Sequence, residues 1–527
     1  VTAPAEYDYQ GGSNSYTVKS CATVSGGGVD KVVPIPWEVE FSEDGIVWNK
    51  NKPAWLTAFT ENEAGGTSAA SYTATVAPQV NSTPDNHTIA LQAAAQKTNW
   101  NLSNSTGADE VQNTANCYLV NAPGTYRLPL VYGNAIKNGA ANTAAYTSAA
   151  SGNNVLTTFI NHLGNGITDP YIYNNANCTP DNCTLVWQDE PNLVTNVALS
   201  SDRHFLEFTV NQSTIRQGNA VVAVRDASNT VLWSWHIWVT DYVPGTKDKT
   251  ITNHQDKQYT IMPYALGWCD EKEEIYAERT VQIRFKQRPT AGYTSAEMKT
   301  FTLKQKAHTI IEIGNNTFYQ WGRKDPFVGG IKINTNKTWY DADGNRNVYQ
   351  NPATEKFSAD NACIVSGIQK PGVYCTNSYM DARYLNLWSA DNDVTTHNDN
   401  IVVKTIYDPC PVGYKLPPSN GFTGFTTTGT NAGEVNKKGA WNEGWNLYCG
   451  KNMTGDTVFF PASGYRLYDS GGVWREGQYG VYWSAVPLRK EDGCAMILFP
   501  SYVYPISPYG QHYYYRGRGF SVWPFQE

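Results

Sequence analysis

The side chains that could carry out a reaction are scattered along this chain of 527 residues. None of its 8 histidines forms a close pair at the spacing of metal ligands. The sequence contains no GxSxG nucleophile elbow, no HExxH helix and no GxxxxGK[ST] phosphate loop. His236 lies in a run of aromatic residues, so we interpret it as a packed histidine. The sequence therefore predicts no catalytic residue, no metal and no cofactor, and we expect that the protein is not an enzyme.

Acidic residues leave two further hypotheses open. Asp341 and Asp343 resemble the start of a calcium loop, but Gly344 falls at the fourth position instead of the sixth, so we interpret the segment as a turn. Asp391, Asp393 and Asp399 could bind a cation through their oxygens. The two carboxylates of a glycoside hydrolase are recognised by the distance between them in the folded chain, which the sequence does not show. A surface carbohydrate-processing enzyme, or its accessory glycan-binding subunit, is therefore kept as an alternative function.

Aromatic side chains near the C-terminus are the strongest candidates for binding. Gly471–Gly472 and residues 505–510 indicate turns and loops, where binding residues concentrate. Rings with a polar edge suit both sugar stacking and protein recognition. Trp474 follows the glycine pair, and no strand alternation obliges it to point inward. Arg516 and Arg518 would add hydrogen-bond donors. The alternative is that the tyrosines line a core. The predicted ligand-binding residues are Tyr468, Trp474, Arg475, Tyr479, Tyr504, His512 and Tyr513.

Composition favours a β protein outside the cell. Charged residues make up 17% of the chain, below the usual ~25%, and the net charge of −7 argues against a nucleic-acid partner. The 34 tyrosines and 17 tryptophans favour sheets over helix bundles. No run of 18 apolar residues predicts a transmembrane helix. Because the chain starts Val-Thr-Ala-Pro, we expect a mature form whose export segment has been removed.

The length predicts about three to four domains. Short alternating strands such as Trp37–Phe41, Tyr72–Val76 and Thr88–Leu91 predict an Ig-like or pilin-like β-sandwich over residues 1–97. Residues 98–115 are polar and aperiodic, which is typical of a linker. A second sandwich region is predicted for residues 116–313. It includes a hairpin of 220–224 and 231–238, in which apolar residues on both faces of the second strand indicate a covered, central strand.

The ten cysteines include no CxxC pair, so zinc-ribbon and thioredoxin-like folds lose their main support. Two pairs lie close enough along the chain to form disulfides, Cys178 with Cys183 and Cys363 with Cys375. The alternative is that these residues are buried thiols, which behave as small apolar side chains.

Five motifs in the last third of the chain resemble a known bacterial domain. They are FYQWGRKDPF (318–327), YDPCPVGYKLPP (407–418), FPASGYR (460–466), GVYWSA (480–485) and GFSVWPF (519–525). Together they resemble the Fibrobacter-succinogenes major paralogous domain of Bacteroidetes surface proteins. Trp523 takes the place of the arginine that precedes the final proline in that family. The segment WSWHIWVTD (233–241) is similar to one that precedes this domain. The prolines and glycines of these motifs suit a structural role.

The resemblance implies a C-type-lectin-like α+β domain over residues 314–527, attached to a fimbrillin-type protein. It further implies cell adhesion by an exported protein of the cell outer membrane surface or fimbrium, which we expect to be a fimbrial tip subunit. Such a protein would bind a glycan or a surface protein of host or bacteria. It would join other fimbrial subunits by donor-strand addition, so a sandwich with an open edge is expected. A purely structural pilus subunit is the remaining alternative.

Overall fold

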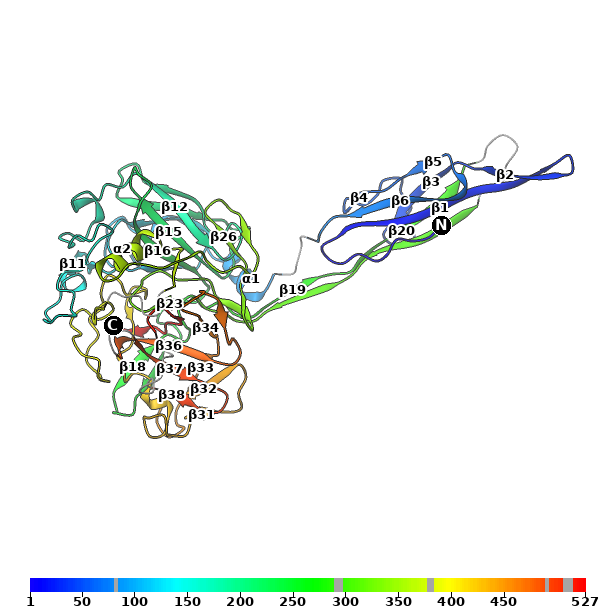
Figure 1. Ribbon diagram of the computed structural model, residues 1–527. Helices are drawn as coiled ribbons and strands as arrows, with labels where there is room; N and C mark the ends of the chain where they lie inside the picture. Colours follow the sequence, from blue (N-terminus) through cyan, green and yellow to red (C-terminus); the bar gives the residue numbers. More distant parts are fainter. Residues whose placement is uncertain (80–83, 289–296, 377–382, 489–491, 506–514) are drawn as a thin grey trace. The chain divides into compact units, whose positions relative to one another are not determined.

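The computed structural model describes residues 1–79, 84–288, 297–376, 383–488, 492–505 and 515–527 (Figure 1). The predicted mainly β fold is confirmed. The described residues form many short strands, three 3₁₀ turns and only two α-helices, α1 (Asn86–Ala93) and α2 (Asn361–Gln369). The chain forms two compact units, which comprise residues 1–85 with 272–311 and residues 86–271 with 312–527.

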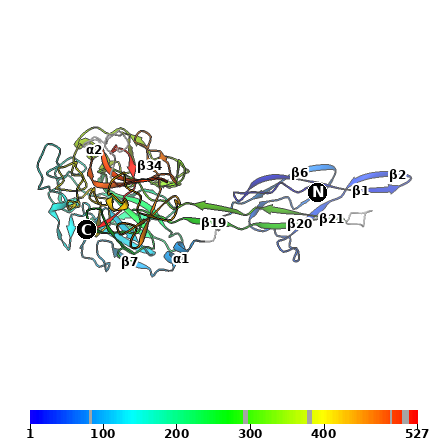
Figure 2. The ribbon, with the colours of Figure 1, turned by 90° about the horizontal axis from the view of Figure 1, so that it is seen from below.

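Unit 1 contains two four-stranded sheets that share one core. The first sheet consists of β2 (Val29–Pro34), β1 (Gly12–Gly26), β6 (Gly66–Val76) and β4 (Leu56–Ala58), in that order. The second consists of β21 (Met298–Gln305), β20 (Arg279–Gln287), β3 (Trp37–Ser42) and β5 (Asn62–Glu63). The strands β19 (Lys272–Tyr276) and β22 (His308–Glu312) form a separate two-stranded ribbon. These two strands lie side by side in Figures 1 and 2.

The second sheet of unit 1 corrects the predicted domain boundaries. Strand β20 pairs with β3 along its length, so that Phe285 lies opposite Val39 and Ile283 opposite Phe41. These side chains are buried in the core that Tyr16 of β1 also enters. A sandwich made of residues 1–97 alone would lose β20 and β21, and with them much of the apolar face that closes its core. The segment 279–305 therefore belongs to the first sandwich and not to a second one.

Unit 2 contains two larger sheets, built mostly from its N-terminal part. The first has the order β27 (Arg346–Asn347), β26 (Trp339–Asp341), β12 (Asn182–Gln188), β15 (Gly218–Arg225), β16 (Val231–Val239) and β8 (Cys117–Val120). The second has the order β13 (Thr195–Leu199), β14 (Phe205–Val210), β9 (Gly124–Pro129) and β7 (Lys97–Asn101). The predicted hairpin is confirmed as β15 and β16. All nine residues of β16 are buried, as expected of a central strand.

Smaller sheets hold the loop-rich remainder of unit 2. Two of them have four strands. One has the order β17 (Lys249–Thr252), β18 (Gln258–Ile261), β40 (Phe525–Gln526) and β30 (Tyr414–Lys415), and the other has the order β23 (Tyr319–Gln320), β39 (Gly519–Phe520), β34 (Tyr465–Arg466) and β35 (Val473–Trp474). Two have three strands, one with β31 (Lys437–Lys438), β32 (Gly444–Tyr448) and β33 (Thr457–Pro461), the other with β36 (Gly480–Pro487), β37 (Gly493–Leu498) and β38 (Val503–Tyr504). Three are hairpins or short ladders: β10 (Ile136–Lys137) with β11 (Ala140–Ala141), β24 (Gly330–Lys332) with β25 (Thr335–Asn336), and β28 (Thr354–Glu355) with β29 (Tyr374–Cys375).

The core of unit 2 crosses the domain boundary that the sequence predicts near residue 313. One continuous cluster of buried side chains runs from Leu91 to Val522 and includes Trp233, Trp321 and Trp483. Strand β26 extends the sheet that β12 begins, and β18 pairs with β40 at the other end of the chain. Apart from residues 272–311, which belong to unit 1, the residues of the expected second sandwich and of the expected lectin-like domain therefore share one folded unit.

Residues 98–115 are folded, which contradicts the predicted linker. Strand β7 pairs in parallel with β9 through Trp100 and Tyr126. After β7, the backbone is held by hydrogen bonds to polar side chains. The side-chain oxygen of Asn101 accepts the backbone N–H of Ser103 at 3.0 Å, and that of Asn104 accepts the N–H of Thr106 at 3.0 Å. Because asparagine can satisfy the backbone locally, a polar and aperiodic segment can be fixed without periodicity.

The proposed disulfides are absent: all ten cysteines are thiols, nine of them buried. The Cys178 thiol lies 3.4 Å from the amide nitrogen of Asn161 and 3.7 Å from the hydroxyl of Tyr132. Burial raises the pKa of the Cys178 thiol. In the part of the chain that the structure describes, no helix is long and apolar enough to cross a membrane.

Whether the second sheet belongs to unit 1 can be tested by substituting one buried and one exposed residue of that sheet. Phe285→Ala removes a core side chain, so we expect unit 1 to lose about 3–5 kcal/mol of stability. Differential scanning calorimetry should show the transition of unit 1 at a lower temperature and that of unit 2 unchanged. Met298→Ala, at an exposed position of β21, is the matched control and should shift neither transition. A Phe285→Ala variant that destabilises unit 2 instead would contradict the observed division.

Candidate functional site

Most of the predicted binding residues that the structure describes lie in one connected group of rings on unit 2. We call this group the aromatic surface. Its rings are at least partly exposed and have the guanidinium groups of Arg475 and Arg518 between them: Tyr465, Tyr468, Trp474, Tyr479, Phe499, Tyr502, Tyr504 and Tyr515. His512 and Tyr513, which the sequence also predicts as ligand-binding residues, lie outside the described residues.

Trp474 is the most prominent ring of this surface. It lies in the two-residue strand β35, where Val473 points into the core and Trp474 keeps 37% of its surface exposed. The next residue, Arg475, has a backbone φ of 69°, in the left-handed region, which turns the chain sharply after the tryptophan. Its guanidinium lies 5.7 Å from the Trp474 ring and 5.3 Å from the Tyr479 ring. A cation is therefore held between two rings that a ligand can reach.

A second part of the aromatic surface continues from Tyr479. The ring of Phe499 lies 4.5 Å from that of Tyr479, 4.4 Å from that of Tyr502 and 5.5 Å from that of Tyr504. Tyr502 and Tyr504 lie on the same side of the chain at β38, while Val503 between them is buried. Sequence reasoning did not select Phe499, although its position before Pro500 at the end of β37 was a turn signal.

The third part joins Tyr468 to this group. Arg518 lies 5.1 Å from the Tyr465 ring and 5.5 Å from the Tyr468 ring, and Tyr468 meets Tyr515 edge-on at 5.1 Å. Arg518, itself buried, thus connects two partly exposed tyrosines.

Two residues from the same stretches of sequence do not belong to the aromatic surface. Arg516 does not contribute a donor here, because it is fully buried and its Nη1 donates to the carbonyl of Tyr384 at 2.6 Å. Tyr482 lies close to Tyr479 in the sequence, but its ring is fully buried within β36. It packs edge-on against Phe460 at 5.4 Å, so the core interpretation of the tyrosines holds for this ring.

Two buried charged residues fix the turn that carries Trp474. Arg466 pairs with Val473 across β34 and β35, and its guanidinium donates to the carbonyls of Gly471, at 2.5 Å, and Val328. Glu476 accepts the backbone N–H groups of Asn334 at 2.8 Å and Thr335 at 3.3 Å. Burial raises the pKa of Glu476 to about 7. The turn is therefore attached to β34 on one side and to the hairpin of β24 and β25 on the other.

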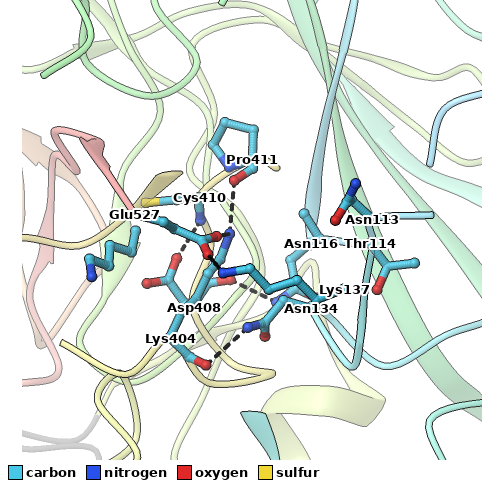
Figure 3. A network of polar contacts seen from close by, with 12 residues as sticks. Asn113, Thr114, Asn116, Asn134, Lys137, Lys404, Asp408, Cys410, Pro411 and Glu527 are labelled. Carbon is cyan, nitrogen blue, oxygen red and sulfur yellow. Dashed lines mark hydrogen bonds and ion pairs between the residues drawn. The ribbon is translucent and has the colours of Figure 1, made fainter. Parts of the chain in front are cut away.

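The motif around Asp408 forms a buried polar network (Figure 3). The carboxylate of Asp408 accepts the N–H groups of Cys410 at 2.7 Å and Leu416 at 3.0 Å. The ammonium of Lys404 donates to the carbonyl of Pro411 at 2.8 Å and lies 3.5 Å from Glu527. Gly413 turns the chain with a φ of 79°. These contacts confirm the structural role expected of the motif. Trp523 is also structural, since it is buried and stacks on Phe460 at 3.8 Å.

Groups that could serve catalysis are present but are engaged within the fold. His236 is buried, with its ring nitrogens 2.9 Å from Asn219 and 3.0 Å from Tyr319, and burial lowers its pKa to about 3. The packed histidine expected from the sequence is thus confirmed. Lys324 donates to the hydroxyl of Ser234 at 2.5 Å, and burial lowers the pKa of Lys324 to about 8. Both side chains are buried, so this serine–lysine contact is closed to a substrate.

One pair of facing carboxylates lies at the surface of unit 2. The amide nitrogen of Gln217 donates to Asp241 at 3.1 Å and to Asp270 at 3.0 Å, so the two carboxylates meet at one donor. His87 of α1 lies 2.9 Å from Asp241 and 3.4 Å from Asp270, and the indole of Trp268 donates to Asp270 at 2.9 Å. These contacts attach α1 to two loops.

Two of the three acidic residues that could have bound a cation, Asp391 and Asp399, contact protein donors. Asp399 accepts the hydroxyl of Tyr259 at 2.7 Å and the amide of Asn253 at 2.7 Å, and Asp391 accepts the N–H of Ala149 at 2.8 Å. Within the described ranges, no group of three histidine, cysteine or acidic residues is arranged to hold a metal ion.

Comparisons of the chain with protein-family models, with curated proteins and with solved structures gave no match.

The raised pKa of Glu476 predicts a pH-dependent stability. In the folded chain its proton is held up to about pH 7, whereas the unfolded chain releases it near 4.5. The folded state therefore binds more protons between these values, and stability falls as the pH rises from about 4.5 to about 7. The shift corresponds to at most about 3 kcal/mol. Glu476→Gln should remove this loss, which urea denaturation between pH 4.5 and 8 would measure.

The matched control for this prediction is Glu434→Gln, at an exposed carboxylate of the same unit. It should keep the pH profile of the unsubstituted chain. Parallel profiles for Glu476→Gln and the unsubstituted chain would show that Glu476 does not carry this dependence.

Proposed function

We propose that this chain is a cell-surface adhesion protein that binds a glycan or a protein ligand non-covalently through the aromatic surface of unit 2. The observation that carries the proposal is the exposed ring of Trp474 beside the guanidinium of Arg475. An aromatic face offers a platform for the apolar side of a sugar or for an apolar side chain, and the guanidinium offers donors to hydroxyl or carbonyl oxygens.

The sequence motifs support the biological setting of this proposal. Their resemblance to Bacteroidetes surface proteins suggests an exported protein on the outer membrane surface or at the tip of a fimbrium. The C-type-lectin-like fold that the resemblance implies for residues 314–527 belongs to the proposal as well. A carbohydrate-processing enzyme is the alternative, and its candidate acid–base pair would be Asp241 and Asp270, which His87, Gln217 and Trp268 contact.

The binding proposal can be tested by truncating one ring. Trp474→Ala should weaken binding about tenfold or more, because a stacked ring contributes about 1–3 kcal/mol by analogy with base stacking. Its melting temperature should hold, since Trp474 is exposed. A glycan array identifies the best glycan, and calorimetric titration then measures its affinity for each variant.

Tyr349→Ala is the matched control. Tyr349 is exposed in the same unit and also has a cation near its ring, Lys332 at 5.6 Å, but it lies outside the aromatic surface. It should bind the glycan as the unsubstituted chain does. Equal affinities for all three proteins would contradict the proposal.

A structural pilus subunit is a second candidate, favoured by one observation. Strand β2 pairs with β1 through residues 29–34 and, among the described residues, has no strand on its other side. Val29 and Val32 are exposed on it. Such an edge can accept an added strand.

If this edge serves assembly, the concentrated chain should form larger species in size-exclusion chromatography coupled to light scattering. Val32→Pro should suppress them, because proline cannot donate to an added strand. The control is Val32→Ala, which shortens the same side chain and keeps the backbone donor. A monomer at every concentration would contradict assembly through this edge.

A further inference from the structure

A cleft of about 460 Å³ opens in unit 2, among residues that the sequence assigned to a linker and its flanks. It is lined by residues of two strands that end their sheets, β7 with Lys97 and Trp100, and β8 with Tyr118. The volume is within the range of sites for small molecules, about 300–1,000 Å³. None of its lining residues belongs to the aromatic surface.

The charge of the cleft comes from one side chain. Lys97 is the only charged residue of the described lining. Its ammonium lies 3.8 Å from the centre of the Trp100 ring, and among the described residues it has no ion-pair partner. Gly107 lies directly against the same indole, because a Cβ there would come within 2.3 Å of the ring. The indole therefore holds at the cleft a cation that no carboxylate of the described residues neutralises, so an anionic ligand can pair with it.

The rest of the lining is neutral and rich in hydrogen-bonding groups. The side chains of Asn121 and Ser105 and the amide nitrogen of Asn113 can meet a ligand, whereas Asn104 is already bonded to Thr106 and Glu110. Rings and apolar side chains complete the walls. A fatty acid chain offers the open groups no hydrogen bond, so it would displace water from them without replacing its contacts. A sugar ring combines hydroxyls for the amides with an apolar face for the rings.

The wall of the cleft is fixed before any ligand binds. Cys117 of β8 forms a parallel bridge with Pro411, whose carbonyl accepts from Lys404 at 2.8 Å (Figure 3). Asn113, also drawn in Figure 3, is attached through its backbone N–H to Ser103 at 2.8 Å and through its side-chain oxygen to the N–H of Asn138 at 3.0 Å. A preformed wall lowers the entropy that binding would otherwise cost.

We propose that this cleft binds an acidic sugar, whose carboxylate pairs with Lys97 and whose hydroxyls meet the asparagine and serine side chains. This site is separate from the aromatic surface, and the proposal does not depend on the function suggested for that surface.

The test compares galacturonate with galactose, which differ only at C6, a carboxylate in the first and a hydroxymethyl group in the second. Each is titrated into the full chain and followed by NMR signals. We expect galacturonate to bind about tenfold more tightly, because a charge-assisted hydrogen bond is about twice as strong as a neutral one. The preference should shrink as salt is added. Lys97→Gln should reduce it to about one, and Lys97→Arg should keep it.

Two controls separate this site from others. Lys437 lies 3.5 Å from the Trp445 ring, so Lys437→Gln removes a similar lysine–tryptophan contact outside the cleft and should leave the preference unchanged. Trp474→Ala should also leave it unchanged; loss of binding there would place the acidic sugar on the aromatic surface and overturn the proposal. Equal binding of both sugars, equally tight binding of hexanoate, no binding at millimolar galacturonate, or a Lys97→Gln variant that keeps the preference would each overturn it too.

Discussion

The side chain of Asn116 connects parts of unit 2 that lie almost 300 residues apart in sequence. Its amide donates to the carbonyls of Ile406 at 2.6 Å and Asp408 at 2.8 Å, and its oxygen accepts the indole N–H of Trp233 at 3.0 Å. Its backbone carbonyl accepts the N–H of His236. Because this amide is buried and each partner is buried with it, losing one contact would leave polar groups unsatisfied at about 1–3 kcal/mol each. The central sheet and the C-terminal loops therefore form one body.

Buried polar side chains with several donors repeat this arrangement through the loop-rich part of the unit. Arg323 donates to the carbonyls of Val373 at 2.9 Å and Lys370 at 3.1 Å, where α2 ends. Asn436 bridges the carbonyls of Gly424 at 3.0 Å and Gly450 at 2.7 Å. Short strands supply few ladder hydrogen bonds, so loop carbonyls need other donors. Asparagine and arginine provide them, which accounts for their burial in a chain with few charged residues.

The sequence predicts local structure well where side-chain periodicity decides it. The hairpin of β15 and β16 follows from alternating apolar residues around a polar loop. Residues 88–91 show the limit of such patterns, since they were predicted as a strand and belong to α1. Thr88 and Leu91, three residues apart, are its buried positions, a helical spacing that four residues alone do not distinguish from a strand. The predicted domain boundaries were wrong because β20 pairs with β3, which lies more than 200 residues earlier, and no local sequence pattern indicates such a pairing.

The aromatic surface could be predicted in part because glycines indicated its turns. The exposure of the Trp474 ring follows from the turn that carries it. What the sequence does not contain is the support below it. Arg466 and Glu476 are both buried although they lie close to that ring in the sequence, and each fixes backbone from a distant segment, Val328 and Asn334. A ring on a fixed turn loses little conformational freedom when a ligand arrives, so more of the contact energy remains for affinity. In the proposed function, the buried charges thus act through the position of Trp474, without contacting a ligand themselves.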